Sequence, residues 1–337
     1  MEALVIPVPR RLTLETTVQF ACKLRDLPPL ESYVFDFSGV GRIEPFSLLF
    51  LSSELQRFKS KRTYAKRFAA SNFEHCTYAG HMGFFKAFGL DFGKSAGEAK
   101  GSGTYIPITI YDVDEIKQTA ADNFEAVGQF IETQAEQMAS VLTRSNSGVL
   151  YDTLTYSIRE IIRNVIEHSE SDQFGFCAQY WPYYGTVELS ILDRGIGIRE
   201  GLSGNPHLNI ANDSEALNLC LMPGISGKAY KGARRNPNDV WANSGYGLYM
   251  TSRLCREGGS YFIASGKTGI YLSENKKRYL ETPFDGTAIK LTLNTTRLSS
   301  LSEMLGRYRK EALELDSSNN NIISASKAST MLARDFK

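Results

Sequence analysis

Four short segments constrain this 337-residue chain more than any other feature, because they stand in a fixed order in its C-terminal two-thirds. They are residues 160–164 (Glu-Ile-Ile-Arg-Asn), 193–197 (Asp-Arg-Gly-Ile-Gly), 245–248 (Gly-Tyr-Gly-Leu) and 285–287 (Asp-Gly-Thr). A single glycine-x-glycine is ordinary turn punctuation. Four segments in this order, each in a suitable structural setting, make a far stronger signal than any one of them.

The first segment lies in a stretch, residues 150–168, whose pattern predicts an amphipathic helix. Its apolar residues recur at three- and four-residue spacing: Leu150, Leu154, Ile158, Ile161 and Val165. Glu160, Asn164 and His168 follow at i, i+4 and i+8, so they project from one side of the helix. Polar groups beside an apolar stripe need partners, which marks this side of the helix as a candidate site.

The second and fourth segments adjoin predicted strands. Residues 186–192 alternate as a half-buried strand that runs directly into Asp193, and Thr287 stands at the start of another strand. A carboxylate at a strand end can accept a hydrogen bond from the exocyclic amine of adenine, a donor that guanine lacks at that edge. Gly195 and Gly197 allow the backbone to turn closely against a base.

The third segment opens a predicted helix. Residues 244–253 indicate a glycine turn followed by a helix, whose free amide groups and dipole favour phosphate. The 47 residues before this turn, 198–244, are too many for an ordinary loop. They contain glycines that supply hinge freedom and cations that can meet phosphate oxygens, including Arg234 and Arg235. Lys228 and Lys231 are therefore candidate phosphate contacts.

Together the four segments resemble the ATP site of the GHKL superfamily, which comprises gyrase, the heat-shock chaperone, histidine kinase and MutL. The resemblance implies a Bergerat α/β sandwich, with helices on a mixed, mostly antiparallel sheet, over residues 104–296. It implies ATP and Mg²⁺ as ligands, with Asn164 as the metal ligand and Glu160 as the general base. Hard oxygen ligands suit Mg²⁺, which keeps several waters and phosphate oxygens.

The same resemblance implies that Asp193 selects adenine and that Thr287 helps to hold this aspartate and its water. The other nucleotide-binding residues that it implies are Gly195, Gly197, Lys228, Lys231, Gly245, Gly247 and Leu248. His168 matches a histidine of anti-sigma-factor serine kinases, the relatives that the segments look most similar to. A hydrogen-bonded histidine at a helix end is an equal alternative.

The first hundred residues read as a small α/β module. Residues 33–37 are rich in β-formers, Pro45 opens a helical pattern through Phe58, and a second helix is expected over residues 76–88. This layout resembles the STAS domain of anti-sigma-factor antagonists. Such domains carry a phosphorylatable hydroxyl before the helix, whereas here Glu-Pro-Phe-Ser stands at 44–47. Residues 1–100 are therefore expected to be a docking or regulatory domain for a protein partner, with a generic α/β domain as the alternative.

Three further segments bear on the organisation of the chain. Residues 93–103 are rich in glycine and small polar residues and indicate a flexible linker. Residues 297–337 are expected to be a helical and polar tail, with a composition shift at 317–321. Residues 265–268 (Ser-Gly-Lys-Thr) look like the end of a P-loop, but Tyr261 stands where that motif requires glycine, so this match is discounted.

Composition narrows the classes of partner. Thirty-eight basic and thirty-seven acidic residues give no global field for nucleic acid. The five cysteines lack Cys-x-x-Cys spacing, which suits reduced thiols in a cytosolic protein better than a disulfide framework or a zinc site. There is neither a signal-peptide pattern nor an apolar run near the ~20 residues of a membrane helix, so a cytoplasmic protein without a membrane partner is expected.

The expected function is that of an ATP- and Mg²⁺-binding regulatory protein, either an ATPase or a serine/threonine kinase of the anti-sigma type. The alternative is a non-catalytic, nucleotide-gated protein-interaction module. A two-component histidine kinase is disfavoured, because residues 112–145 contain no histidine to phosphorylate. A homodimer is left open.

Overall fold

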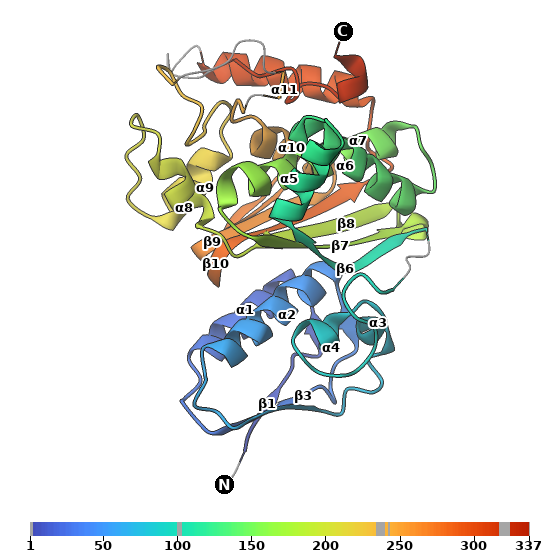
Figure 1. Cartoon of the computed structure of the whole chain (residues 1–337), viewed down its shortest axis with the longest axis vertical. Coiled ribbons are helices and arrows are strands. Elements are labelled where there is room, and N and C mark those ends of the chain that lie inside the picture. The colour runs from blue at the N-terminus through green and yellow to red at the C-terminus, as the bar shows by residue number, and fades with distance from the viewer. Residues whose placement is uncertain (1–2, 100–102, 234–239, 242, 317–323, 337) are drawn as a thin grey trace.

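The structure is a computed structural model that describes residues 3–99, 103–233, 240–241, 243–316 and 324–336. An N-terminal module, blue in Figure 1, lies against a larger part that is built on a second sheet. The fold is therefore mixed α/β, with small parallel sheets in the module and an antiparallel sheet in the larger part.

Short parallel strands form the N-terminal module. In its described residues, one sheet has the strand order β1-β3-β5, and β2 pairs with β4. The strands are β1 (Leu4–Pro7), β2 (Arg11–Leu12), β3 (Ser32–Asp36), β4 (Arg42–Ile43) and β5 (Arg67–Ser71). The helices are α1 (Leu14–Arg25), α2 (Pro45–Ser60), α3 (Thr77–His81) and α4 (Phe84–Ala87).

The predicted strand at 33–37 and the helix that opens at Pro45 are confirmed as β3 and α2. Proline suits the first turn of α2, because the amide that it lacks has no intrahelical partner there. The single helix expected over 76–88 is wrong. Gly83 has φ +87°, a left-handed conformation that ends one helix and separates α3 from α4.

An antiparallel sheet forms the centre of the larger part. Within the described residues its strand order is β6-β7-β8-β10-β9, and each of its pairings is antiparallel, which differs from the mixed sheet that was expected. The strands are β6 (Tyr105–Asp112), β7 (Gln173–Trp181), β8 (Thr186–Asp193), β9 (Ser260–Ser273) and β10 (Lys277–Asn294). Residues 265–268 lie inside β9, not in a phosphate loop.

The helices of the larger part lie on one side of this sheet (Figure 1). They are α5 (Val113–Asp122), α6 (Val127–Thr143), α7 (Val149–Asn164), α8 (Gly197–Ser203), α9 (Asp213–Cys220), α10 (Gly247–Cys255) and α11 (Leu301–Asp316). A π-helical turn, η1 (Val165–Ser169), follows α7, and short 3-10 turns occur at Pro182–Tyr184 and Ala333–Asp335. Among the described residues, no helix combines the length and the apolar character needed to cross a membrane.

Both faces of the five-stranded sheet are covered (Figure 1). Successive residues of a strand point to opposite faces. Ile191 of β8 packs in a core with residues of α6 and α7, whereas Leu192 packs in the core that α1 and α2 contribute. The strand expected to be half-buried is therefore buried from Val187 to Asp193, and that expectation was wrong because the N-terminal module covers the second face.

A buried ion-pair group joins the module to the sheet. The ammonium of Lys290 on β10 lies 2.8 Å from a carboxylate oxygen of Glu44 and 2.9 Å from one of Glu188 on β8. The other oxygen of Glu188 accepts the Phe46 amide at 2.9 Å, at the start of α2. Burial alone would lower the pKa of Lys290, but the two carboxylates outweigh it and raise this pKa.

The expected flexible linker is hydrogen-bonded over residues 93–99. The Lys94 amide donates to the Gly80 carbonyl at 2.9 Å, and the Gly97 amide donates to the Ile108 carbonyl at 2.8 Å. These bonds tie the segment to α3 and to β6, so the expectation of flexibility is wrong there. Residues 100–102 of the expected linker lie outside the described residues.

The C-terminal region is part of the fold. The helix expected near residues 298–315 is confirmed as α11, while the composition shift at 317–321 lies outside the described residues. Residues 324–336 pack on α7: the Tyr156 hydroxyl donates to the Ser329 carbonyl at 2.7 Å, and Arg334 pairs with Asp152 at 2.6 Å. Within the expected helical and polar tail, this segment is therefore packed against α7.

Candidate functional site

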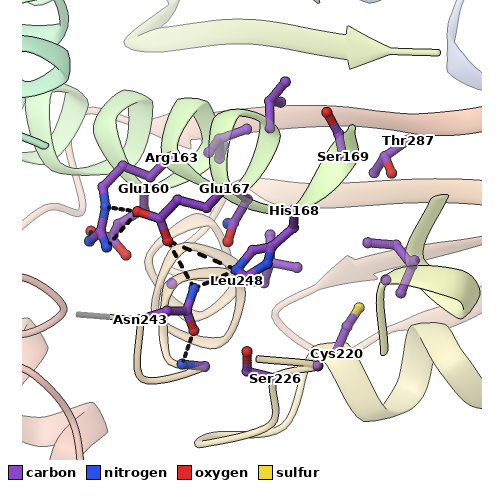
Figure 2. A pocket seen from close by; sticks show the side chains of 18 of the residues that line it. Glu160, Arg163, Glu167, His168, Ser169, Cys220, Ser226, Asn243, Leu248 and Thr287 are labelled. Atoms are coloured by element: carbon purple, nitrogen blue, oxygen red, sulfur yellow. Dashed lines mark hydrogen bonds and ion pairs between the residues drawn. The ribbon is translucent and has the colours of Figure 1, made fainter. Parts of the chain in front are cut away.

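A solvent-open pocket lies among α7, β8, α8, β10 and α10. Figure 2 shows part of its lining, with side chains that converge from separate elements. All four sequence segments contribute to it. The predicted residues that line it are Glu160, Asn164, Asp193, Gly197, Gly245, Gly247, Leu248 and Thr287. Gly195, Lys228 and Lys231 are not part of the lining.

Asp193 and Thr287 form one end of the pocket. They are paired across β8 and β10, so the strand register fixes their proximity. The carboxylate of Asp193 accepts the Gly195 amide at 2.9 Å and is also bonded by the Thr287 amide. Burial raises the pKa of Asp193 to about 6 against the effect of these two amides. Apolar side chains, among them Ile191 and Ile289, line this end of the pocket.

Thr287 occupies a different position from the predicted strand start. It lies within β10, where the pairing with β9 resumes after register shifts between Glu281 and Phe284 and between Phe284 and Thr287. A bulge re-aims the following side chains. The bulge, and not a strand end, therefore positions Thr287 opposite Asp193.

The two glycines after Asp193 have packing roles. A Cβ at Gly195 would lie 1.8 Å from the Ser169 carbonyl oxygen, so this glycine lets the turn pack against η1. Gly197 has φ +77°, and a Cβ there would lie 2.7 Å from the Ser265 hydroxyl. That hydroxyl accepts the Ile198 amide at 2.9 Å and donates to the Gly286 carbonyl at 2.8 Å. Ser265, which the sequence showed only within a discounted motif, thus connects the start of α8 to the fourth segment.

The N-terminus of α10 forms part of the opposite end. Gly247 packs so closely against α7 that a Cβ would lie 2.6 Å from the Glu160 Oε2 and 3.5 Å from the Asn164 Nδ2. Gly245 has φ +72°, and a Cβ there would overlap the backbone of Ile225. Glycine at both positions brings the start of a nine-residue helix to the pocket. Its unpaired amides and dipole favour an anion.

Glu160 belongs to a buried ion-pair group that sequence reasoning missed. Its Oε1 accepts Arg159 Nη2 at 2.9 Å and Nε at 3.1 Å, and Arg163 lies 3.6 Å from the same oxygen. Arg159 is fully buried and also pairs with Glu132 of α6 at 2.5 Å. Burial lowers the pKa of Arg159, but Glu160 and Glu132 outweigh it. Oε2 of Glu160 remains directed at Gly247.

Asn164 has unused hydrogen-bonding capacity. Its Nδ2 is buried and has no hydrogen-bond partner among the described residues, although the side chain lines the pocket. Buried polar atoms rarely stay unpaired without a ligand or water. The described residues contain no group of three or more His, Cys, Asp or Glu that could hold a metal ion. Mg²⁺ at this site would therefore need phosphate and water oxygens besides the side-chain oxygen of Asn164.

A second polar network borders the same end (Figure 2). Glu167 accepts Arg163 Nε at 2.9 Å and Asn243 Nδ2 at 3.2 Å, and Asn243 also bonds His168. The Asn243 side-chain oxygen accepts the Gly245 amide at 2.9 Å, which fixes the glycine turn. Neither Asn243 nor Glu167 was among the site residues predicted from the sequence.

The turn η1 positions His168. The predicted helix to residue 168 is wrong in its last turn, because the α-helix ends at Asn164 and a π-helical turn follows. Such turns shift the direction of side chains and are frequent at functional sites. His168 lines the pocket, and burial, together with Lys228 and Arg163, lowers its pKa to about 4.

The two candidate lysines differ. Lys228 donates to the Glu167 carbonyl, so it lies close to the pocket that Glu167 lines. Lys231 contributes its backbone carbonyl as acceptor for His207 at 2.9 Å and does not line the pocket. The neighbouring Arg234 and Arg235 lie outside the described residues.

The C-terminal segment adds a residue that no sequence pattern indicated. Ser329 lines the pocket, and its hydroxyl lies 2.9 Å from that of Ser244. The carbonyls of Ala328 and Met331 accept hydrogen bonds from Arg159. The segment thus contacts the pocket and also holds the arginine that pairs with Glu160.

In comparisons with known proteins, no protein-family model matches this chain, and no curated protein sequence matches it either.

Proposed function

We propose that this chain binds ATP or ADP with Mg²⁺ in the pocket and acts as an ATP-dependent regulatory protein of the GHKL class. One observation carries the proposal: the four segments, which are far apart in sequence, line a single pocket. Asp193 and Thr287 form one end, and Glu160, Asn164 and Gly247 form the other.

The end at Asp193 suits a purine base. A carboxylate that is 3% exposed needs hydrogen-bond donors, and the exocyclic amine of adenine supplies one. Apolar walls with a few convergent polar groups are typical of small-molecule sites. Ile191, Ile198 and Ile289 supply such walls next to Asp193.

The end at α10 suits phosphates. The helix N-terminus offers free amides, and Asn164 offers an amide side chain that lacks a protein partner at Nδ2. Mg²⁺, when bound, would neutralise charge on the phosphates. Asn164 would hold it together with phosphate and water oxygens.

For the chemistry, we propose either ATP hydrolysis or transfer to a serine or threonine of a partner protein, with Glu160 as general base through Oε2. The alternative, a nucleotide-gated module without catalysis, is favoured by one specific observation. Oε1 of Glu160 is held by Arg159, and the whole side chain is 4% exposed. A carboxylate bound in this way is also suited to a purely structural role.

Two variants separate binding from catalysis. Asn164→Ala should weaken ATP binding in the presence of Mg²⁺ by about tenfold or more, because a bond to a charged group contributes roughly 1.5–3 kcal/mol. Glu160→Ala should retain nucleotide and lose turnover or transfer. Calorimetry with and without EDTA measures the first effect, and phosphate release or labelled transfer measures the second.

Asn123→Ala serves as a matched control, because Asn123 is exposed at the end of α5 and does not line the pocket. Equal ATP affinity of Asn164→Ala and this control, at every Mg²⁺ concentration, would contradict the metal assignment. If the wild-type protein binds ATP but shows neither hydrolysis nor transfer with any partner, the non-catalytic alternative is correct.

A further inference from the structure

One face of α2 contacts both turns that carry the proposed base-binding residues. Phe50, Ser53, Glu54 and Arg57 are spaced at i, i+3, i+4 and i+7, so they lie on one side of this helix. They face the turn at 193–197 and the turn at 283–287 of the larger part. The N-terminal module therefore contacts both turns, and these four residues do not themselves line the pocket.

Arg194 connects the first turn to α2. Its guanidinium donates to the Ser53 hydroxyl at 2.7 and 3.0 Å and pairs with Glu54 at 2.7 Å. Glu54 is buried, whereas the Arg194 side chain is partly exposed. Because Arg194 directly follows Asp193, these contacts limit the movement of the Asp193 backbone.

The second turn is held by the same helix. Arg57 pairs with the carboxylate of Asp285, and its guanidinium donates to the Pro283 carbonyl at 3.3 Å. Phe284, between Pro283 and Asp285 in the sequence, stacks on Phe50 with ring centroids 4.9 Å apart. Phe284 is fully buried, so the bulge that positions Thr287 is seated on α2.

Arg194 also bridges the two turns. Its guanidinium lies 4.0 Å from the centroid of the Phe284 ring, and it donates to the Asp285 carbonyl at 3.3 Å. Side chains of α2 thus form one connected group with Arg194, Phe284 and Asp285. We name this group the turn clamp; its residues are Phe50, Ser53, Glu54, Arg57, Arg194, Phe284 and Asp285.

We propose that the turn clamp positions Asp193 and Thr287 for adenine, so that the N-terminal module is a built-in part of the nucleotide site and sets its affinity. The inference rests on the proposed nucleotide binding. Arg194 and Glu54 are positioning residues in this account: they act through the backbone of the two turns and do not line the pocket. A change in the seating of α2 would therefore alter adenine binding.

The test compares Glu54→Gln, Arg194→Gln and the double variant with wild type. Glu54→Gln keeps the size of the side chain, and Ser53→Ala is a milder second variant that removes only one hydroxyl. Glu31→Gln is the matched control, because Glu31 forms an exposed ion pair with Lys66 in the same module. Each protein is titrated with ADP by calorimetry.

We expect Glu54→Gln and Arg194→Gln each to weaken ADP binding by about five- to tenfold, a partial loss of what a charged hydrogen bond contributes. The double variant should bind ADP no more weakly than whichever single variant has the lower affinity, because both changes break one connected group. The control should bind like wild type. ADP affinities of all variants within twofold of wild type would overturn the clamp.

Hydrogen exchange without nucleotide separates this inference from the proposed function. Peptides covering residues 190–198 and 284–289 should both exchange faster in Glu54→Gln than in the control, since breaking the clamp loosens both turns. Unchanged exchange in both peptides would overturn the clamp, whether or not ADP binds. Absence of ADP binding by wild type would overturn the proposed function and the affinity role, whereas the exchange result would still decide whether the clamp holds the turns.

Discussion

Asp193 shows how burial and hydrogen bonding act against each other at one residue. Its carboxylate lies at the end of a strand that is buried on both faces, and burial raises its pKa from 3.8 to about 6. Two backbone amides from the adjoining turns moderate that shift. The folded protein therefore holds this proton more tightly than the unfolded chain. The resulting stabilisation is complete below the ordinary pKa and is lost as the pH rises through about 6.

The raised pKa predicts a pH dependence of nucleotide binding. Protonation of Asp193 removes the charged acceptor for the exocyclic amine of adenine. ADP affinity should therefore fall below about pH 6, by up to about tenfold per pH unit. Calorimetry between pH 5 and 8 measures this step. His168 does not obscure it, because its pKa of about 4 keeps the imidazole neutral over this range. Asp193→Asn, which cannot titrate, should show a smaller step than wild type, because only the ADP phosphate titrates in this range. A step of equal size in this variant would refute the assignment.

Individual residues also show where sequence reasoning ends. Asp193, Thr287, Glu160 and Asn164 could be placed at one site because short motifs mark them. Ser329 could not, because a lone serine in a polar segment carries no pattern that links it to a helix far away in sequence. Only the folded chain brings such residues together.

At the scale of elements, α7 owes its position to a charged group inside the fold. Arg159 connects this helix to α6 through Glu132 and to the C-terminal segment through the carbonyls of Ala328 and Met331. The backbone of the segment adds a bond, because the Ala333 amide donates to Glu132 at 2.6 Å. The segment at 324–336 thus supports the helix that carries Glu160 and Asn164.

This arrangement predicts a large effect of Glu132→Gln on stability. The loss should be about 1.5–3 kcal/mol, the contribution of a hydrogen bond to a charged group, because the buried Arg159 still pairs with Glu160. Urea unfolding should show this loss. Glu136→Gln is the matched control, one turn later on α6 and only partly buried. Equal unfolding midpoints for the two variants would contradict the structural role of the pair.

The bounds of the elements that carry the site were mostly predictable. The apolar spacing of α7 and the alternation of β8 gave their types and approximate ends. The π-helical turn at η1 was not predictable, because the periodicity of residues 150–168 continues through it. The bulge in β10 was missed for a similar reason: alternation locates a strand but does not reveal an interruption of its pairing.

At the scale of the whole molecule, the N-terminal module and the larger part share one core. Residues of α1 and α2 pack with Cys177, Leu192 and Phe262 of the five-stranded sheet in one apolar cluster. The buried Lys290 between Glu44 and Glu188 adds charge pairing to this interface. The sequence suggested two modules with a glycine-rich boundary, but composition alone does not show which faces the modules bury against each other.

This packing limits the surfaces of the N-terminal module that a protein partner, as proposed from the sequence, could contact. Ser47, the hydroxyl nearest to the expected acceptor position, is fully buried and accepts the Thr17 hydroxyl at 2.8 Å. The helices α1 and α2 cover the sheet, so a partner protein would contact other surfaces of the module. Coupling between partner and pocket would then pass through the turn clamp.

The central claim is that the four segments form an adenine-nucleotide site with Asp193 as the base-selecting residue. Calorimetric titration of wild type and Asp193→Asn with ADP and GDP, in the presence of Mg²⁺ at pH 7.5, tests it most directly. The account predicts that wild type binds ADP at least about tenfold more tightly than GDP, and that Asp193→Asn weakens ADP binding about ten- to a hundredfold. Equal affinity of wild type for ADP and GDP, or an Asp193→Asn variant that binds ADP like wild type, would contradict it.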